Sequence, residues 1–487
     1  MLPAQSLVHS VKKPEVLIVG AGLGGLTLAI LLEMANVPYV VYERATEVKS
    51  LGSSLFLGPD MAPFFQQIGI FGEFLTRSKP CNSIDTYNEH RKKTSTMDFA
   101  TAAMMSGYHG YIIPRSAFYD ILLKRIPGHR IHRGKNVLSI VQDSKGVMIR
   151  CSDGTTANGD VLVGADGANS VVRQSLYKQM QKDGRLASMD SKPLPNTCIC
   201  LVGQSDPLDP AKYPELNDTF GHFDDILSDD KPYSNNVMCW SVIQYLTKES
   251  PKCDDSAKDT EWSSEAAETM CNEVRGFPIP SGNGALTLGD LIDSTPKDQI
   301  SKAILKERVF NTWYHGRTVL IGDACHKIHP AGGQGALLAM HDAIALANWI
   351  NVLPSTSIKN TAMIFRAYKN ERYPAAREAY DNGHMMARMF TWNFRAKIIR
   401  YMAKHMPPWM HNASMRMNVM NRPQVSFLPL AKDTGSIRPQ YQPSLFKTLE
   451  MIRNTNRTTI IAVNIGDGES LNVSDDDTSL LDLFDFL

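Results

Sequence analysis

A glycine-rich turn between an apolar strand and a helix constrains the fold of this chain more than any other feature. Residues 16–20 (VLIVG) form a continuous apolar run, which is typical of a strand that is buried on both faces. The sequence Gly20-Ala-Gly22-Leu-Gly-Gly25 follows, and the helical segment LTLAILLEMA comes next. A second apolar segment, YVVYER, contains Glu43. A strand, a helix and a second strand in this order predict a βαβ unit, which specifies a parallel sheet.

The spacing of the three glycines is the one that a dinucleotide requires. Gly20 permits the tight turn, Gly22 lets the backbone approach a pyrophosphate, and Gly25 lets the helix pack against the strand. Free N–H groups and the positive dipole at the N-terminus of the helix favour phosphate. Glu43 ends the second strand, where its carboxylate can accept both ribose hydroxyls of an adenosine. Because this acid would repel a 2′-phosphate, the site favours FAD or NAD over NADP.

Two later apolar strands also end in glycine and aspartate. Asp166 follows the strand VLV and precedes Gly167; this pair suits a polar contact near a nucleotide, and it is equally common as an ordinary turn. Asp323 follows the strand TVLI, where it can accept a hydrogen bond from a sugar or ribityl hydroxyl. The loop 332–335 places backbone N–H groups at the start of a long helix, which suits the negative charge of a reduced flavin. We infer one nucleotide-binding domain assembled from three stretches of chain.

The three segments, in this order, give the chain a resemblance to the class A FAD-dependent monooxygenases of the aromatic hydroxylase superfamily. The resemblance covers about residues 15–350. Within that family the chain looks most like the fungal FAD-dependent monooxygenases of secondary metabolism, through WYHGRTVLIGDACHKIHPAGGQGA and the later RPQVSFLP. Two positions depart from the family pattern: Leu337 stands where Asn is usual, and His341 stands where an acid is frequent.

The resemblance adds residues to the expected cofactor site. It implies that Arg115, in IIPRSAFYD, contacts FAD and that Gly52, in LGSSLFLGP, corresponds to a family glycine after the acidic residue. The complete predicted FAD site comprises Gly20, Gly22, Gly25, Glu43, Gly52, Arg115, Asp166, Asp323, Gly335 and Ala336.

The predicted fold is an α/β protein with a Rossmann-like FAD-binding domain (GxGxxG), an inserted, mainly β substrate domain and a helical C-terminal region. The predicted FAD-binding domain comprises residues 14–80, 115–186 and 307–380. The predicted substrate domain comprises 81–114 and 187–306, followed by the helical region 381–450 and a mobile acidic tail, 451–487.

The resemblance also implies a reaction. NADPH or NADH would reduce FAD transiently, and the reduced flavin would take up O2 to form a C4a-hydroperoxide. This species would hydroxylate or epoxidise a small lipophilic or aromatic substrate. Two alternatives stay open: an FAD-dependent reductase or oxidase on the same fold, and a flavin-fold binding protein without turnover. No residue is assigned as a catalytic acid or base.

Composition excludes some other functions. Lysine and arginine number 51 against 50 acidic residues, so net charge gives no reason to expect nucleic acid as a partner. Cys198 and Cys200 share an apolar strand, and His326 and His329 lie in CHKIHP, but neither pair has the further ligands that a metal site needs. We therefore predict no metal. No signal peptide or membrane-spanning stretch is evident, which predicts a cytoplasmic protein.

The region 393–420 combines cations with methionines at helical spacing. One interpretation is a helix that lies on a membrane surface and delivers a lipophilic substrate, which would make the protein peripherally membrane-associated. The other, which the sequence alone favours, is a helix packed on the domain with its basic face in water.

Overall fold

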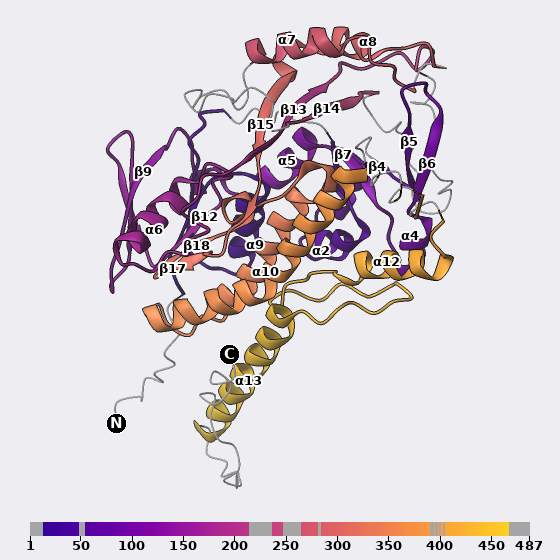
Figure 1. Ribbon diagram of the computed structural model, residues 1–487. Helices are drawn as coiled ribbons and strands as arrows, with labels where there is room; N and C mark the ends of the chain where they lie inside the picture. Colours follow the sequence, from indigo (N-terminus) through magenta and orange to yellow (C-terminus); the bar gives the residue numbers. More distant parts are fainter. Residues whose placement is uncertain are drawn as a thin grey trace.

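The protein is built around a six-stranded sheet in the order β17-β18-β12-β1-β2-β8 (Figure 1). The computed structural model describes residues 13–47, 54–213, 236–246, 264–280, 284–389, 394, 398, 401–402 and 405–466. The strands of this sheet are β1 (Val16–Val19), β2 (Tyr39–Tyr42), β8 (Ile131–His132), β12 (Val161–Gly164), β17 (Tyr314–His315) and β18 (Thr318–Leu320).

Parallel pairing joins segments that are far apart in the sequence. β1 pairs in parallel with β2 on one side and with β12 on the other, and β12 pairs in parallel with β18. Every residue of β1 and β12 is buried, as the continuous apolar runs predict. The predicted βαβ unit and the single domain built from three stretches are therefore present.

Helices cover this sheet. They are α1 (Leu23–Met34), α5 (Arg115–Leu123), α6 (Val171–Lys182), α9 (Gly335–Asn351) and α10 (Ile358–Met389). α1 and α9 are buried along most of their length, and they approach closely, because a β-carbon at Gly24 would lie 3.2 Å from the β-carbon of Ala339. Trp349 and Phe365 belong to the same core as the central strands.

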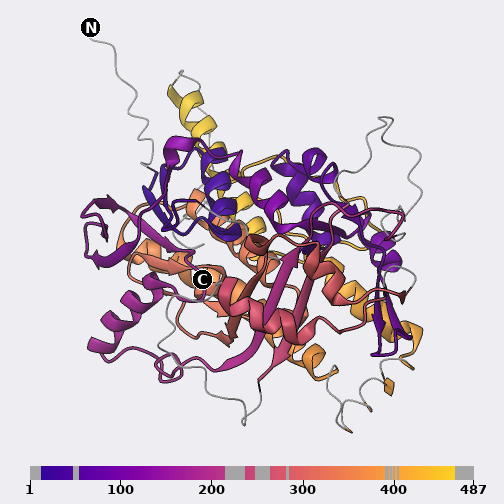
Figure 2. The same ribbon diagram turned by 90° about the horizontal axis from the view of Figure 1, so that it is seen from above.

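A second layer lies over one end of this domain (Figures 1 and 2). Its main sheet is antiparallel, with β13 (Asn196–Gln204) between β14 (Cys239–Tyr245) and β15 (Ser301–Lys306). Two helices, α7 (Ser264–Val274) and α8 (Leu288–Asp293), share its core. Trp240 is buried there and donates a hydrogen bond from Nε1 to Thr295 Oγ1 at 3.0 Å. The predicted substrate domain thus combines strands with helices.

The remaining strands and α-helices lie outside these two main sheets and their helices. The strands are β3 (Ser54–Leu57), β4 (Lys79–Pro80), β5 (Ser83–Tyr87), β6 (Lys93–Asp98), β7 (Tyr111–Pro114), β9 (Val137–Gln142), β10 (Val147–Cys151), β11 (Thr156–Gly159), β16 (Arg308–Val309) and β19 (His326–Lys327). The helices are α2 (Ala62–Gln67), α3 (Phe71–Leu75), α4 (Ala100–Ser106), α12 (Pro408–Met420) and α13 (Pro443–Gly466).

The C-terminal region is helical, as predicted, but its helices run across the boundaries expected from composition. α10 continues without a break past residue 380, and α13 continues past residue 450. Between α12 and α13 the chain is held against the main domain, because Asn348 of α9 accepts a hydrogen bond from Ser426 N at 2.8 Å and donates one to Gln424 O at 3.0 Å. Among the described residues, no helix combines the length and apolar character needed to cross a membrane.

A buried arginine joins the β9–β10 hairpin to the edge of the central sheet. Arg317 is 2% exposed, and its guanidinium donates to the carbonyls of Asp143, Ser144, Asp160 and Thr356. We expect Arg317→Ala to lower the free energy of unfolding by about 3 kcal/mol, because these carbonyls would lose a charged donor. Urea denaturation followed by circular dichroism measures this. The control, Arg185→Ala at an exposed position, should change it by less than about 0.5 kcal/mol. Equal effects of the two substitutions would contradict the assignment.

Candidate functional site

Four sequence-predicted residues come together at one edge of the central sheet. Since β1, β2, β12 and β18 are parallel, their carboxyl ends lie side by side. Gly20, Glu43, Asp166 and Asp323 each follow one of these ends. Backbone hydrogen bonds join the first turns after the strands, from Gly20 N to Tyr42 O at 2.8 Å and from Ala165 N to Val19 O at 2.8 Å. The structure therefore brings all three motif segments to one place.

The glycine turn has the geometry that its spacing predicts. Gly20 has φ +104°, and a β-carbon there would lie 2.4 Å from Ala165 O. A β-carbon at Gly25 would lie 2.1 Å from Gly20 O, so this glycine is required for the helix to pack. A β-carbon at Gly22 would meet no atom within 4 Å. Gly22 caps α1 without a side-chain hydrogen bond, so the first N–H groups of the helix face open space that fits a pyrophosphate.

Glu43 accepts hydrogen bonds from the glycine turn and can still accept further hydrogen bonds from a ligand. Its Oε2 accepts a hydrogen bond from Ala21 N at 2.8 Å, and its Oε1 accepts one from Ala45 N at 2.9 Å. Each carboxylate oxygen has two lone pairs, so one remains on each for a ribose hydroxyl. The carboxylate is therefore positioned by the backbone amides of the two segments between which an adenosine would lie.

Arg115 and Asp323 lie close enough to interact electrostatically. Arg115 begins α5, directly after β7, and its side chain is exposed. Even so, desolvation lowers the pKa of its guanidinium, while the negative charge of Asp323 acts in the opposite direction. Asp323 is half-buried, and its carboxylate accepts no hydrogen bond from any described residue, so it is available to a ligand.

A second free helix N-terminus completes the site. The loop 332–335 leads into α9, whose N-cap, Gln334, makes no side-chain capping hydrogen bond. Gly333 has φ +61°, and a β-carbon at Gly333 or Gly335 would meet no atom within 4 Å. Gly335 and Ala336 are the first two residues of α9 and are half-buried. Their N–H groups therefore belong to an uncapped helix end beside open space, which fits the flavin expected there.

Asp166 differs from the other predicted residues, because its carboxylate is already bonded within its own segment. Oδ1 accepts from Ser170 Oγ at 2.5 Å, and Oδ2 accepts from Val172 N at 3.1 Å, so Asp166 holds the start of α6. Burial raises the pKa of this carboxyl. Gly167 has φ +76°, as an Asp-Gly turn requires. A contact between Asp166 and a cofactor remains a prediction, and Gly52 lies outside the described residues.

Arg173 ties the second motif segment to the third, a role that the sequence analysis missed. It is 5% exposed and donates to Ala324 O at 2.9 Å and to Ala168 O at 2.5 Å. Its guanidinium also lies 4.4 Å from the centroid of the Phe310 ring. The sequence offers no signal for this role, because the partners are brought together by the parallel pairing of β12 and β18.

A buried ionic cluster is hydrogen-bonded to the Gly322-Asp323 turn. Asp342 of α9 accepts hydrogen bonds from Gly322 N at 3.0 Å and Arg372 Nε at 2.9 Å, and its Oδ2 lies 2.5 Å from His326 Nε2. Burial by itself would raise the pKa of Asp342, but His326, Arg372 and the amide of Gly322 lower it to about 2. The signal that could have identified this residue is a charged side chain within an otherwise apolar helix.

A second buried cluster lies beside the glycine loop. Glu307 is 2% exposed, and its carboxylate oxygens lie 3.0 Å from His384 Nε2 and 3.7 Å from His329 Nε2. His329 Nδ1 accepts a hydrogen bond from Ala331 N at 3.1 Å, so the neutral ring carries its proton on Nε2, facing Glu307. Desolvation lowers the pKa of His329, which favours this neutral form. The cluster can hold a proton next to the loop 332–335, and His384 connects it to solvent.

Each cluster brings a cysteine, a histidine and an acid together, which are side chains that can ligate a metal. The sequence analysis found no acidic partner for these cysteines and histidines. Cys198 joins Glu307 and His329, and Cys325 joins His326 and Asp342. The acids come from distant parts of the chain, so spacing could not reveal them. A histidine that ligates a metal usually donates through its other ring nitrogen, whereas the other nitrogen of His329 accepts. The charge of Asp342 is balanced by Arg372, so the Asp342 cluster fits hydrogen-bonded ion pairs better than a metal.

A parallel sheet whose strand ends carry a dinucleotide turn, a ribose-binding acid and a second uncapped helix defines a site for an adenine dinucleotide carrying a flavin. The family described as "FAD binding domain" matches residues 13–201 and 288–383. This is more than half of the chain, and the chain belongs to that family. The prediction of an FAD-dependent oxidoreductase is confirmed at this level.

Curated relatives extend the comparison. The chain is 29% identical to the FAD-dependent monooxygenase paxM of Penicillium paxilli over 389 residues, which covers 77% of this chain and 78% of the relative. It is 25% identical to the FAD-dependent monooxygenase ausM of Penicillium brasilianum, with 92% of this chain and 94% of the relative covered. The predicted resemblance to fungal FAD-dependent monooxygenases is confirmed.

Solved structures confirm the fold. HpxO of Klebsiella pneumoniae, in its complex with FAD and uric acid, matches with a TM-score of 0.64 and 17% identity, covering 84% of this chain and 97% of that chain. The 2,6-dihydroxypyridine-3-hydroxylase of Arthrobacter nicotinovorans matches with a TM-score of 0.60 and 18% identity, covering 78% and 93%.

Two glycine substitutions separate cofactor binding from folding. We expect Gly22→Val to fold, because its φ of −73° suits any residue and its β-carbon meets nothing. It should weaken FAD binding about tenfold or more, because the side chain would enter the space for the pyrophosphate. Gly25→Val should instead lower thermal stability. Visible flavin absorbance and thermal unfolding measure the two effects. Full flavin occupancy in Gly22→Val, or native stability in Gly25→Val, is inconsistent with these roles.

The Asp342 cluster predicts a pH-dependent contribution to stability. Its folded pKa of about 2 lies below the ordinary value of 3.8, so the ionised carboxylate contributes stability that is complete above the ordinary value and lost as pH falls through about 2. The difference in unfolding free energy between wild type and Asp342→Asn should therefore narrow by about 2 kcal/mol as pH falls from about 5 to about 2. Urea unfolding across this range tests it, with Asp183→Asn, at an exposed position, as control. A constant difference would argue against the ion pairs.

Proposed function

We propose that this protein is an FAD-dependent monooxygenase that uses NADPH or NADH and O2 to hydroxylate or epoxidise a small lipophilic or aromatic substrate in the cytoplasm. The observation that carries the proposal is that the glycine turn 20–25, Glu43, Asp323 and the uncapped end of α9 are brought together by the parallel strands. They lie at the carboxyl ends of these strands, where such folds bind their ligands. The names of the fungal relatives support the same reaction class.

Each part of the site has a distinct task in this proposal. The turn 20–25 would hold the pyrophosphate, Glu43 the adenosine ribose, and Asp323 a ribityl hydroxyl. The N–H groups at Gly335 and Ala336 would face the flavin ring, where the helix dipole favours negative charge. Bound FAD supplies the redox chemistry with nicotinamide and O2. The protein orients the cofactor and substrate and limits the access of water.

Glu307 and its histidine partners would control a proton beside the flavin loop. His329 caps the turn Pro330–Gly332, and Gly383 of α10 packs so closely that a β-carbon there would lie 3.1 Å from His329 Cβ. His329 therefore couples the buried Glu307 carboxylate to the position of the loop. His384, with 34% of its side chain exposed, would exchange the proton with water.

Two alternatives fit the same cofactor site. An FAD-dependent reductase or oxidase would differ in how O2 is used, and a flavin-fold binding protein would show no response to nicotinamide. The intact set of Gly20, Glu43, Arg115, Asp166 and Asp323 favours an enzyme over a binding protein, and the response to nicotinamide decides between them.

Purified protein distinguishes these functions. We expect a two-band flavin spectrum, and slow oxidation of added NADPH or NADH under air with release of hydrogen peroxide. Asp323→Ala should hold much less flavin, whereas the exposed control Asp298→Ala should hold as much as wild type. A colourless protein that takes up no FAD would overturn the proposal. Bound flavin that neither nicotinamide reduces would favour an oxidase or a binding protein.

A further inference from the structure

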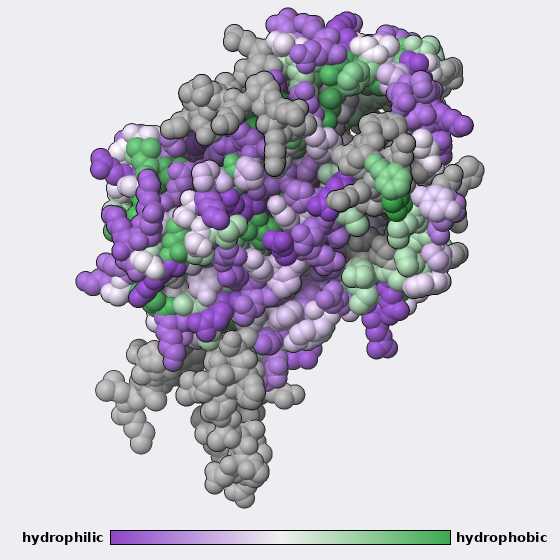
Figure 3. Space-filling model, in the orientation of Figure 1, coloured by the Kyte–Doolittle hydropathy of each residue, from purple (hydrophilic) through white to green (hydrophobic). Residues whose placement is uncertain are grey.

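Exposed apolar side chains gather on α4 and α12. Met104 on α4 is 71% exposed, and Trp409, Met410 and Met417 on α12 are 68%, 42% and 63% exposed. Together they define the α4–α12 face, at the right of Figure 1, where Figure 3 shows hydrophobic residues at the surface. The chain just before α12 adds the exposed residues Phe394, Ile398, Tyr401, Met402 and Met406. Scattered exposed apolar residues are ordinary, but a cluster of this kind marks an interaction surface.

Another side of α12 packs against α4. Met415 and Val419 are buried and pack with Ala102 and Met105 of α4. These positions lie four residues apart on α12, so they form one stripe facing α4. The exposed side chains of Trp409, Met410 and Met417 lie outside this stripe.

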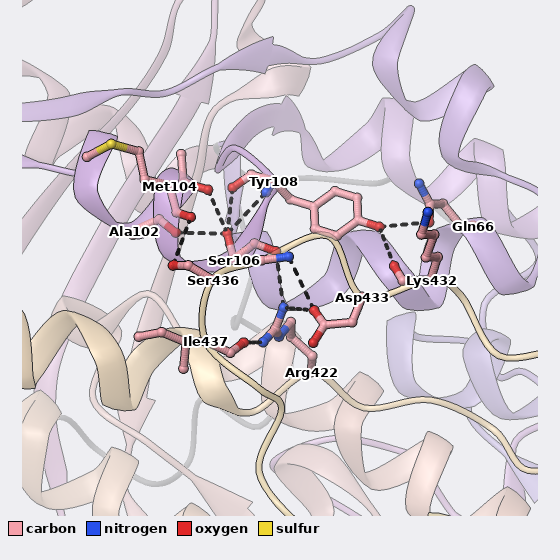
Figure 4. Close-up of polar contacts among 12 residues, drawn as sticks. Gln66, Ala102, Met104, Ser106, Tyr108, Arg422, Lys432, Asp433, Ser436 and Ile437 are labelled. Carbon is pink, nitrogen blue, oxygen red and sulfur yellow. Dashed lines mark hydrogen bonds and ion pairs between the residues drawn. The ribbon is translucent and has the colours of Figure 1, made fainter.

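A buried arginine holds α12 against α4 (Figure 4). Arg422, two residues after α12, is 1% exposed and donates from Nη1 to Ser106 O at 3.1 Å and to Asp433 Oδ1 at 2.7 Å. It also donates from Nη2 to Ile437 O. The guanidinium thus connects the end of α4 to the segment that follows α12.

Further contacts lock this segment onto α4. Ser436 Oγ donates to Met104 O at 3.3 Å, and Ile437 N donates to Met105 O at 3.1 Å. A β-carbon at Gly435 would lie 2.4 Å from Met105 O, which shows how closely the two backbones approach. Tyr108 OH donates to Gln66 Oε1 at 2.9 Å and extends the attachment to α2. The face is therefore built on a fixed support, and its apolar side chains cannot fold back into the core.

The charge of this part of the chain has one sign. Between Asp381 and Asp433 the sequence contains no aspartate or glutamate. It contains eight lysines and arginines: Arg388, Arg395, Lys397, Arg400, Lys404, Arg416, Arg422 and Lys432. Arg422 is buried and paired with Asp433, but the other seven still make this stretch locally basic in a chain whose net charge is +1. Arg416, on α12, and Lys432 are exposed in the structure.

We propose that the α4–α12 face docks on the surface of an anionic lipid bilayer. Tryptophan and methionine side chains would enter the headgroup region, while exposed cations such as Arg416 on α12 would meet anionic lipid. The attraction between such cations and anionic lipid is electrostatic, so salt screens it. An acidic protein would satisfy the charge but would not require so many protruding apolar side chains. The surface does not depend on the proposed reaction, because it lies on other elements than the cofactor site.

Vesicle flotation of the full-length, flavin-loaded chain tests this. We expect binding to phosphatidylcholine vesicles that contain phosphatidylserine, weaker binding to phosphatidylcholine alone, and release at high salt. The affinity of the double variant Trp409→Glu with Met417→Glu for the anionic vesicles should be lower by about tenfold or more. Leu138→Glu is the matched control, because Leu138 is 59% exposed on β9, at the far side of the molecule in Figure 1. It should bind like wild type.

Other outcomes would overturn the proposal. Wild type that floats with neither vesicle, or that floats equally with both at every salt concentration, excludes an anionic bilayer as the partner. Equal loss in Leu138→Glu excludes this face. A wild-type dimer that the double variant dissociates, without vesicle binding, would identify the face as a contact between two copies. Bound flavin and circular dichroism show that each variant is folded, and nicotinamide oxidation is measured separately, so failure of the reaction is distinguishable from failure of docking.

Discussion

The site depends on the parallel pairing of β1 with β12 and of β12 with β18. This pairing places the residues after three distant strands at one edge, and it tolerates no side chain at Gly20, where a β-carbon would lie 2.4 Å from Ala165 O. A side chain there would separate the turn after β1 from the turn after β12. The glycine is thus needed as much for the meeting of two strands as for the approach of a phosphate.

Buried charges then hold the strand ends in place. Asp342 accepts a hydrogen bond from Gly322 N, and Arg173 donates one to Ala324 O, so the residues on both sides of Asp323 are held. Burying these groups has a large desolvation cost, which is offset by ion pairs and by hydrogen bonds to the backbone. These contacts fix the position of the turn that carries Asp323. The carboxylate of Asp323 is therefore not needed to hold the turn and can remain free of protein partners.

Local pattern predicted the elements of the central sheet and the separate tasks of Gly20, Gly22 and Gly25, because strand burial and turn sterics are properties of short segments. Arg115 required the resemblance to a family, since nothing in its own segment marks it. Partners such as Glu307 with His384 are set by tertiary packing and carry no spacing signal. Helix ends are set by packing as well as by composition, and α10 and α13 continue past residues 380 and 450, where composition changes.

One helix connects the cofactor site to the α4–α12 face. The N-terminus of α9 lies at the flavin loop, and His341, two turns further on, accepts from Asn421 at the end of α12, with Nδ1 and Nδ2 3.3 Å apart. The proton of His341 is then on Nε2, which lies 3.2 Å from Asp60 Oδ2. Because His341 contacts both Asp60 and the residue that ends α12, a change of position at the α4–α12 face would reach α9, the helix whose N-terminus we propose to face the flavin.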